Sequence, residues 1–139
     1  MKVKIKRVGE GILPVYKREG DVCMDCFSRK NETVFGFCRR TVPLGFALEL
    51  PVGYEAVIRP RSGFSKDGID VSIGTIDTNY RGEVMACVSN TTDEDFVIEK
   101  GDRICQLAIR EAPKVEWDVV EELSETERGD NGFGSSGIK

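Results

Sequence analysis

Short runs in which apolar and polar residues alternate recur along the chain, at residues 3–5, 46–50, 71–73, 96–98, 104–109 and 115–119. A period of two places successive side chains on opposite faces of an extended backbone, so each run predicts a β-strand. Glycine, proline, asparagine and aspartate separate the runs, and no stretch holds three turns of helical periodicity. The pattern predicts an all-β domain of sandwich or barrel type, with at most one short helix near residues 62–66.

The sequence changes character toward its C-terminal end. Residues 121–127 are acidic with almost no core-forming side chains, and residues 128–137 hold four glycines. Phe133 is a large apolar ring in this segment. A mobile tail is one interpretation, and a segment that becomes ordered over a ligand is the other. We therefore divide the chain into a β-barrel core, 1–122, and a flexible C-terminal arm, 123–139.

Composition and charge narrow the chemistry. The chain has 139 residues, which is enough for one domain with its own core. Its 20 basic and 24 acidic residues give a net charge of −4, which provides no broad cationic surface for a nucleic-acid backbone or an anionic membrane. Histidine is absent, which excludes Ser–His and Cys–His nucleophiles and histidine-ligated metals. Any catalysis therefore uses carboxylates, lysine, arginine, hydroxyls, thiols or a bound cation.

The termini and cysteines bear on location. The first residues alternate charged and apolar side chains and lack the apolar region of a secretory signal. No run approaches the roughly 18 apolar residues of a membrane helix. The five cysteines are scattered and odd in number, as expected for reduced thiols. Cys23 and Cys26 have the spacing of a metal knuckle, but with no histidine only Cys38, Cys87 or Cys105 could complete the four ligands of a zinc site. We expect a soluble, cytoplasmic protein with neither nucleic acid nor membrane as a partner.

Residues 60–63 combine groups that suit a phosphate. Arg61 offers a planar guanidinium fork, and the Ser62 hydroxyl and Gly63 amide can complete an oxygen shell. An ordinary turn with an exposed arginine is the alternative. Ser135 and Ser136, with the glycines around them, form a second group of donors that can wrap an anion.

Two further positions carry candidate chemistry. Residues 74–83 lie between apolar runs, and the turn formers at 77–79 predict a β-hairpin. Asp77 could serve there as a carboxylate base and Tyr80 as an aromatic plate for a flat ligand face, or both could belong to a plain hairpin tip. Gln106 places an amide on the otherwise apolar face of its predicted strand, so it needs a backbone or ligand partner.

The order and spacing of these segments resemble a known family. Asp25, then residues 60–63, 74–82, 101–107 and 128–137, are similar to the five ordered motifs of the trimeric dUTP pyrophosphatases, or dUTPases. The resemblance spans almost the whole chain. It implies a distorted jelly-roll-like β-barrel assembled as a homotrimer, in which each active site takes motifs from different subunits and a C-terminal arm closes over it.

The resemblance also implies an activity and a role for each site residue. The activity is hydrolysis of dUTP to dUMP and pyrophosphate with Mg²⁺ across the triphosphate, which limits uracil in DNA and supplies dUMP for dTMP synthesis. Asp77 would activate the water that attacks the α-phosphorus, Tyr80 would pack on the deoxyribose, and Asp25 would help to order metal-bound water. Backbone near Gly74 would read the uracil edge, and Phe133 would stack on that base. The phosphate contacts would come from Arg61, Ser62, Gly63, Gln106, Arg128, Gly134, Ser135 and Ser136.

Three departures from the family pattern stand in the sequence. Val22-Cys23-Met24 precedes Asp25 where a small residue and glycine are usual, Asn79 occupies a position often held by aspartate, and Ser136 replaces the commoner threonine. A dCTP deaminase, which shares the fold and trimer, is one alternative, although it would need a glutamate base and a different second motif. A non-catalytic nucleotide-binding trimer with a regulatory protein partner is the other.

Overall fold

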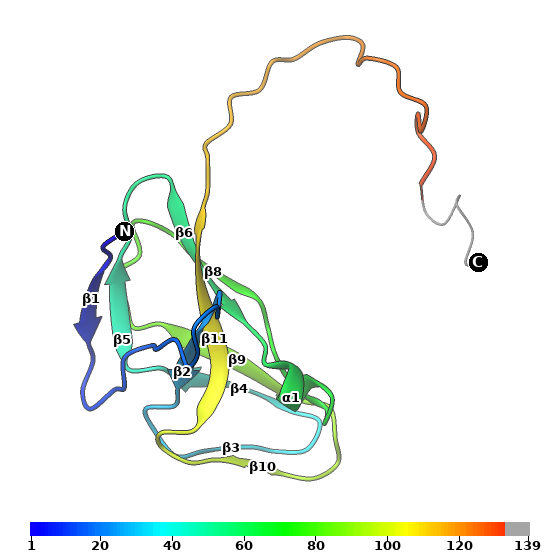
Figure 1. Cartoon of the computed structure of the whole chain (residues 1–139). Coiled ribbons are helices and arrows are strands. Elements are labelled where there is room, and N and C mark those ends of the chain that lie inside the picture. The colour runs from blue at the N-terminus through cyan, green and yellow to red at the C-terminus, as the bar shows by residue number, and fades with distance from the viewer. Residues whose placement is uncertain (133–139) are drawn as a thin grey trace.

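The computed structural model describes residues 1–132 and is almost entirely β-structure (Figure 1). This confirms the all-β prediction. In chain order the elements are β1 (Lys4–Arg7), β2 (Met24–Phe27), β3 (Glu32–Val34), β4 (Arg39–Pro43), β5 (Phe46–Glu49), β6 (Tyr54–Arg59), α1 (Ser62–Ser65), β7 (Ile69–Val71), β8 (Gly74–Ile76), β9 (Met85–Asn90), β10 (Phe96–Ile98) and β11 (Arg103–Glu111).

The strands form antiparallel sheets. The largest has the order β2-β11-β6-β8, and a three-stranded sheet has the order β4-β9-β7. The remaining strands pair as β1-β5 and β10-β3. In Figure 1 the β10-β3 ribbon lies at the lower end of the body and β1-β5 along its left side. Neighbours in the large sheet come from distant parts of the chain, so the sheet brings β2 and β11 together.

The core lies between the sheets. Every strand except β1 contributes a side chain to one buried apolar cluster. In β9 the alternation is plain, because Ala86, Val88 and Asn90 are buried while the residues between them are partly exposed. Removing one large apolar side chain from water stabilises the fold by roughly 1.5–3 kcal/mol. The largest fully buried side chains are Phe46, Leu44, Ile58, Ile98, Ile104 and Leu107.

The single helix is the short one that the sequence predicts. It is one turn long and begins directly after Arg61, whose carbonyl oxygen accepts from the Phe64 N–H at 3.0 Å. The Phe64 ring meets the edge of Phe96 with centroids 5.5 Å apart. This contact anchors α1 against β10, and with it residues 60–63, which the sequence predicts to contact phosphate.

The predicted strand at 115–119 is wrong for the isolated chain. No strand follows β11 within the described residues, and Val115, Trp117 and Val119 are 71%, 85% and 92% exposed. Figure 1 shows this part of the chain leaving the body after β11 as a long extended segment. A strand needs a partner for its backbone groups, and the rest of the same chain provides none here.

The predicted hairpin at 74–83 is also wrong in its pairing. β8 pairs with β6, whereas β9 pairs with β4 and β7, so the two strands belong to different sheets. The turn itself is present, since the Tyr80 N–H donates to the Asp77 carbonyl oxygen at 3.1 Å. Residues 77–83 therefore connect two sheets, and we call them the sheet-connecting turn.

Candidate active site

A buried carboxylate organises the centre of the site. Asp25 lies in β2 and is only 6% exposed. Arg103 Nη1 donates to its Oδ2 at 3.0 Å, and Gln106 Nε2 donates to its Oδ1 at 3.3 Å. The backbone of Asp25 is fixed as well, because its N–H donates to the Val15 carbonyl oxygen at 2.8 Å. Both oxygens of this carboxylate are thus engaged by cationic or amide donors.

Asp25 is charged in this setting. Burial alone would raise the pKa of its carboxyl, but the hydrogen bonds from Arg103 and Gln106 and the charges of Arg61 and Arg103 act in the opposite direction. The net result is a pKa below the ordinary aspartate value. The carboxylate is therefore an anionic centre that orients the donors around it.

Arg61 is the remaining member of this group, and we call Asp25, Arg61, Arg103 and Gln106 the Asp25 cluster. Its Nε lies 4.0 Å from Asp25 Oδ1, and its Nη1 donates to the Arg103 carbonyl oxygen at 2.5 Å. The guanidinium lies 5.1 Å from the centroid of the Phe64 ring. About a quarter of the side chain, 26%, faces solvent. Arg61 is thus held by the protein on several sides and still open to an anionic ligand.

Ser62 and Gly63 follow Arg61 and are exposed. The structure therefore brings four predicted phosphate-contacting residues to one region. Gln106 is held there by its hydrogen bond to Asp25. Arg61 is held by its own contact with Asp25, and Ser62 and Gly63 follow it directly in the chain. Together they offer guanidinium, amide and hydroxyl donors within one partly open cluster. Such a donor set can bind a polyanion and stabilise charge that develops on it.

The sheet-connecting turn holds the other predicted residues. Asp77 and Tyr80 are both exposed, and the Tyr80 hydroxyl donates to the Glu83 carbonyl oxygen at 3.0 Å. A Cβ on Gly82 would overlap the Tyr80 ring, so a glycine is needed beneath it. Among residues 1–132, no hydrogen bond or ion pair joins Asp77 or Tyr80 to Asp25, Arg61 or Gln106. Within the described part of one chain, no polar contact therefore links these two parts of the predicted site.

Gly74 lies between the two parts. It begins β8, pairs with Ile58 of β6, and is partly exposed. β8 is the last strand of the large sheet, so one of its edges has no neighbouring strand there. Backbone donors and acceptors at such an edge can read the polar edge of a flat ligand.

Comparison with known proteins decides the family. A model of the family described as dUTPase matches residues 10–137. This chain belongs to the dUTPase family. It is 44% identical to the deoxyuridine 5′-triphosphate nucleotidohydrolase of Orientia tsutsugamushi (strain Boryong) and 46% identical to that of Hydrogenobaculum sp. (strain Y04AAS1), with 100% of each chain covered in both cases.

The fold agrees with that of solved family members. A mutant Staphylococcus bacteriophage 80alpha dUTPase with dUpNHpp superposes with a TM-score of 0.92, at 25% identity and over 99% of both chains. The predicted family and its jelly-roll-like fold are therefore confirmed.

Part of the predicted site lies in or beyond the C-terminal arm. Arg128 is exposed, and its Nε donates to the Asn131 carbonyl oxygen at 2.9 Å. Within the described chain it contacts none of the Asp25 cluster. The predicted roles of Phe133, Gly134, Ser135 and Ser136 fall outside the described residues.

The residues of this dUTPase family member fit Mg²⁺ only together with a ligand. Between residues 1 and 132, no group of three or more cysteine and acidic side chains could hold an ion by itself. Mg²⁺ usually keeps several waters and takes one or two carboxylates plus substrate phosphate oxygens. Asp77 is an exposed carboxylate, and Asp25 is already engaged by Arg103 and Gln106. The donor set therefore suits an ion carried mainly by phosphate oxygens and water.

Sequence reasoning missed two parts of the site. Arg103 received no role, although it makes the shortest bond to the Asp25 carboxylate. Glu83 received none either, yet its carbonyl oxygen holds the Tyr80 hydroxyl. The only available signal was position in the sequence: Arg103 lies inside the motif-like segment 101–107, and Glu83 directly follows the segment 74–82.

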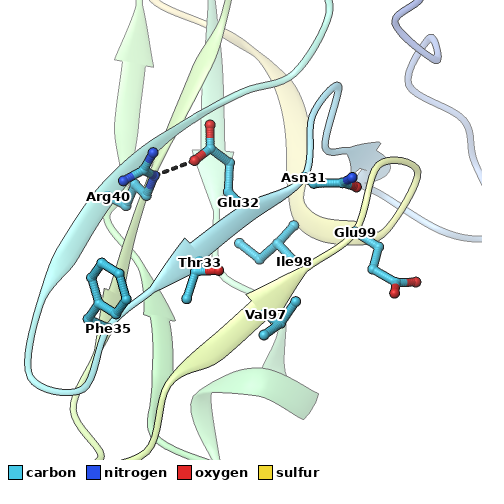
Figure 2. Close-up of a pocket in the computed structure, with 8 residues that line it drawn as sticks. All are labelled: Asn31, Glu32, Thr33, Phe35, Arg40, Val97, Ile98 and Glu99. Atoms are coloured by element: carbon cyan, nitrogen blue, oxygen red, sulfur yellow. Dashed lines mark hydrogen bonds and ion pairs between the residues drawn. The ribbon is translucent and has the colours of Figure 1, made fainter.

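A separate hollow of about 410 Å³ lies over the β10-β3 ribbon (Figure 2). Phe35 and Val97 line it, and an ion pair between Arg40 and Glu32 lies at its side. It contains none of the predicted site residues.

Two further observations concern the helix and the cysteines. No helix in the described part of the chain is both long and apolar enough to cross a membrane. All five cysteines are free thiols, as the sequence predicts.

Proposed function

We propose that this chain is a dUTP diphosphatase, which hydrolyses dUTP to dUMP and pyrophosphate. Full-length identity of 44–46% to two deoxyuridine 5′-triphosphate nucleotidohydrolases supports the activity. The observation that carries the proposal is the convergence of Arg61 and Gln106 on the buried Asp25 carboxylate. Removing dUTP would limit uracil incorporation into DNA and supply dUMP for dTMP synthesis in the cytoplasm.

The predicted phosphate-contacting residues bind and orient the triphosphate. Arg61, Ser62, Gly63 and Gln106 donate to its oxygens, and Asp25 fixes the Gln106 amide and the Arg61 guanidinium from behind. Charge that develops on the phosphate oxygens is stabilised by donors that are already in place. Bound Mg²⁺ would add positive charge along the triphosphate, and Asp25 would help to order its water shell.

Asp77 is the proposed general base. Its carboxylate accepts a proton from a water molecule while the water oxygen forms a bond to the α-phosphorus. The bond from that phosphorus to the bridging oxygen breaks, and the electron pair leaves with pyrophosphate. Tyr80 packs on the deoxyribose and leaves no room for a 2′-hydroxyl, and the free edge of β8 near Gly74 reads uracil. Its fixed backbone groups would reject cytosine, because the wrong pattern leaves polar groups unpaired.

A homotrimer would unite the two halves of the site. No hydrogen bond or ion pair joins Asp77 to the Asp25 cluster within one described chain, and in the proposed assembly a second copy brings the two together. The exposed apolar side chains of Val115, Trp117 and Val119 support assembly, because an isolated chain leaves them in water. We keep the division of the chain at residue 122 as a proposal, although the last strand of the described residues already ends at Glu111.

The arm, 123–139, would close over the bound nucleotide. Arg128 would pair with the γ-phosphate and Phe133 would stack on uracil. Gly134, Ser135 and Ser136 would complete the phosphate cage with backbone and hydroxyl donors. Ordering this segment costs conformational entropy, which contacts to base and phosphates together would offset, and its release would let the product leave.

The deciding experiment measures pyrophosphate release from dUTP, dTTP, dCTP and UTP with Mg²⁺. We expect rapid release from dUTP and far slower release from the other three. Ammonia release from dCTP would instead identify a deaminase. A folded, assembled protein that binds dUTP but releases pyrophosphate from none of the four would be a non-catalytic binding protein, and the proposal would be wrong.

A further inference from the structure

An arginine–glutamate pair lies outside every segment assigned to substrate contact. Arg29 follows β2, and its Nε and Nη2 donate to Glu83 Oε1 and Oε2 at 2.7 and 2.9 Å. The two side chains are 22% and 19% exposed. A two-point contact of this kind fixes the relative orientation of both groups as well as their distance.

Both partners are anchored on the body of the domain. The Gly45 N–H donates to Glu83 Oε1 at 2.9 Å, and the Arg29 N–H donates to the Pro43 carbonyl oxygen at 2.9 Å. The aliphatic part of Arg29 lies across Gly45, since a Cβ there would lie 3.3 Å from Arg29 Cδ. The pair therefore connects the end of the sheet-connecting turn to the chain between β4 and β5.

Backbone bonds hold the chain just after the turn, because the Val84 N–H donates to the Phe46 carbonyl oxygen at 2.8 Å and the Leu44 N–H donates to the Val84 carbonyl oxygen at 3.1 Å. Within the turn, the other side-chain hydrogen bonds are local: the Tyr80 hydroxyl donates to the Glu83 carbonyl oxygen, and Arg81 donates to the Thr78 carbonyl oxygen at 2.6 Å. The Arg29–Glu83 pair therefore adds a side-chain link from the turn to the body of the domain. Glu83 is thus the one residue of the turn that bonds to Tyr80 through its backbone and to Arg29 and Gly45 through its side chain.

We propose that Arg29 and Glu83 are positioning residues, which hold the sheet-connecting turn so that Tyr80 and Asp77 face substrate in a productive geometry. This inference rests on the proposed function. Neither side chain touches the nucleotide in this scheme, so the pair acts only through the turn. The Arg29 hydrogen bond lowers the pKa of Glu83 more than partial burial raises it, and the Gly45 N–H adds to the lowering, so the pair is charged at neutral pH.

The test separates the position of Tyr80 from overall stability. Glu83→Gln keeps an oxygen for the Gly45 N–H but loses the charge, Arg29→Met keeps the apolar stem, and Arg29→Lys keeps the charge without the fork. Glu32→Gln is the matched control, because Glu32 pairs with Arg40 over the β10-β3 ribbon, away from the turn. Each protein is labelled with 3-fluorotyrosine, and its ¹⁹F spectrum, urea unfolding and dUTP kinetics are recorded. Tyr80→Phe assigns the Tyr80 signal among the three tyrosines.

We expect Glu83→Gln and Arg29→Met to shift or broaden the Tyr80 signal and to lower kcat for dUTP by about 10–100-fold, as a small misplacement of reacting groups does. Arg29→Lys should lie between them and the parent protein. Glu32→Gln should leave both readouts unchanged even where it lowers the unfolding midpoint equally.

An unchanged Tyr80 signal with unchanged kcat in the folded variants would overturn the positioning role. Failure of all three variants to fold, while the control folds, would also overturn it, since the pair would then serve the whole fold. A parent protein without dUTP hydrolysis would sink the proposed function instead, and the ¹⁹F comparison would still report on the turn.

Discussion

Gln106 and Asp25 lie directly opposite each other on β11 and β2, and the Gln106 amide donates to Asp25 Oδ1 at 3.3 Å. The sequence predicts that the Gln106 amide, on an otherwise apolar strand face, needs a polar partner. That partner is the buried Asp25 carboxylate. One N–H of the amide is used in this bond, which leaves the second N–H for another acceptor. The carboxylate thus fixes the Gln106 amide while one of its donors stays available.

Asp25→Asn should destabilise the domain. The amide group removes the negative charge between Arg103 and Arg61 and offers donors where Arg103 and Gln106 already donate. Leaving such groups without an acceptor costs about 1–3 kcal/mol. Urea unfolding measures the loss, with Asp67→Asn as the control because its side chain is 64% exposed and should change stability by less than about 0.5 kcal/mol. An equal effect of the two substitutions would contradict the central role of Asp25.

Acid should weaken the fold through Asp25 and Glu83. Both carboxyls have a lowered pKa in the folded chain, so the unfolded chain takes up protons first as the pH falls. Their contribution to stability is therefore complete above the ordinary carboxyl pKa of about 4 and is lost as the pH falls through the folded values. Unfolding free energies between pH 7 and pH 3 should fall less steeply in Asp25→Asn than in Asp67→Asn. Parallel curves would be inconsistent with a depressed Asp25 pKa.

Alternation along the chain was enough to predict the fold class but could not identify partners. The runs at 46–50, 96–98 and 104–109 are strands because other strands of the same chain cover them. The run at 115–119 has the same pattern and no such partner among residues 1–132. The turn at 77–79 was visible from its residue types, whereas the pairing of β8 with β6 depends on contacts far away in sequence.

The site was predictable only where short motifs carry it. Arg61 and Gln106 could be assigned from resemblance to family motifs, and both lie at the Asp25 cluster. The ion pair between Arg29 and Glu83 joins positions 54 residues apart. Neither residue differs by type from the many other charged residues of the chain, so only the folded arrangement reveals that they meet.

Asp77→Asn should separate binding from chemistry. Asparagine has nearly the same shape but cannot accept a proton from water, so we expect kcat for dUTP to fall by about 10²–10⁴-fold. Affinity for a non-hydrolysable dUTP analogue, measured by calorimetry, should stay close to that of the parent protein. Asp70→Asn, at another exposed aspartate, is the control. Undiminished turnover would remove Asp77 from the role of base.

Ending the chain after Arg128 should impair turnover more than assembly. The truncation removes Phe133 and the donors at 134–136 but keeps every strand of the described residues and the apolar side chains at 115–119. Pyrophosphate release and sedimentation are compared with those of a chain that ends at residue 137, where the family match also ends. Kinetics identical to those of the longer chain would show that the arm is dispensable.

Trp117 should report on assembly. It is the only tryptophan in the sequence and is 85% exposed in the single chain, beside the similarly exposed Val119. If copies of the chain cover this segment, the emission maximum of Trp117 should lie at shorter wavelength in the assembled protein. It should shift to longer wavelength when dilution or urea dissociates the assembly. Val119→Asp should weaken assembly, because a charge would be buried without a partner. Val52→Asp, at an equally exposed turn, should not. A trimer by sedimentation with water-exposed Trp117, or one indifferent to Val119→Asp, would show that other surfaces hold the subunits together.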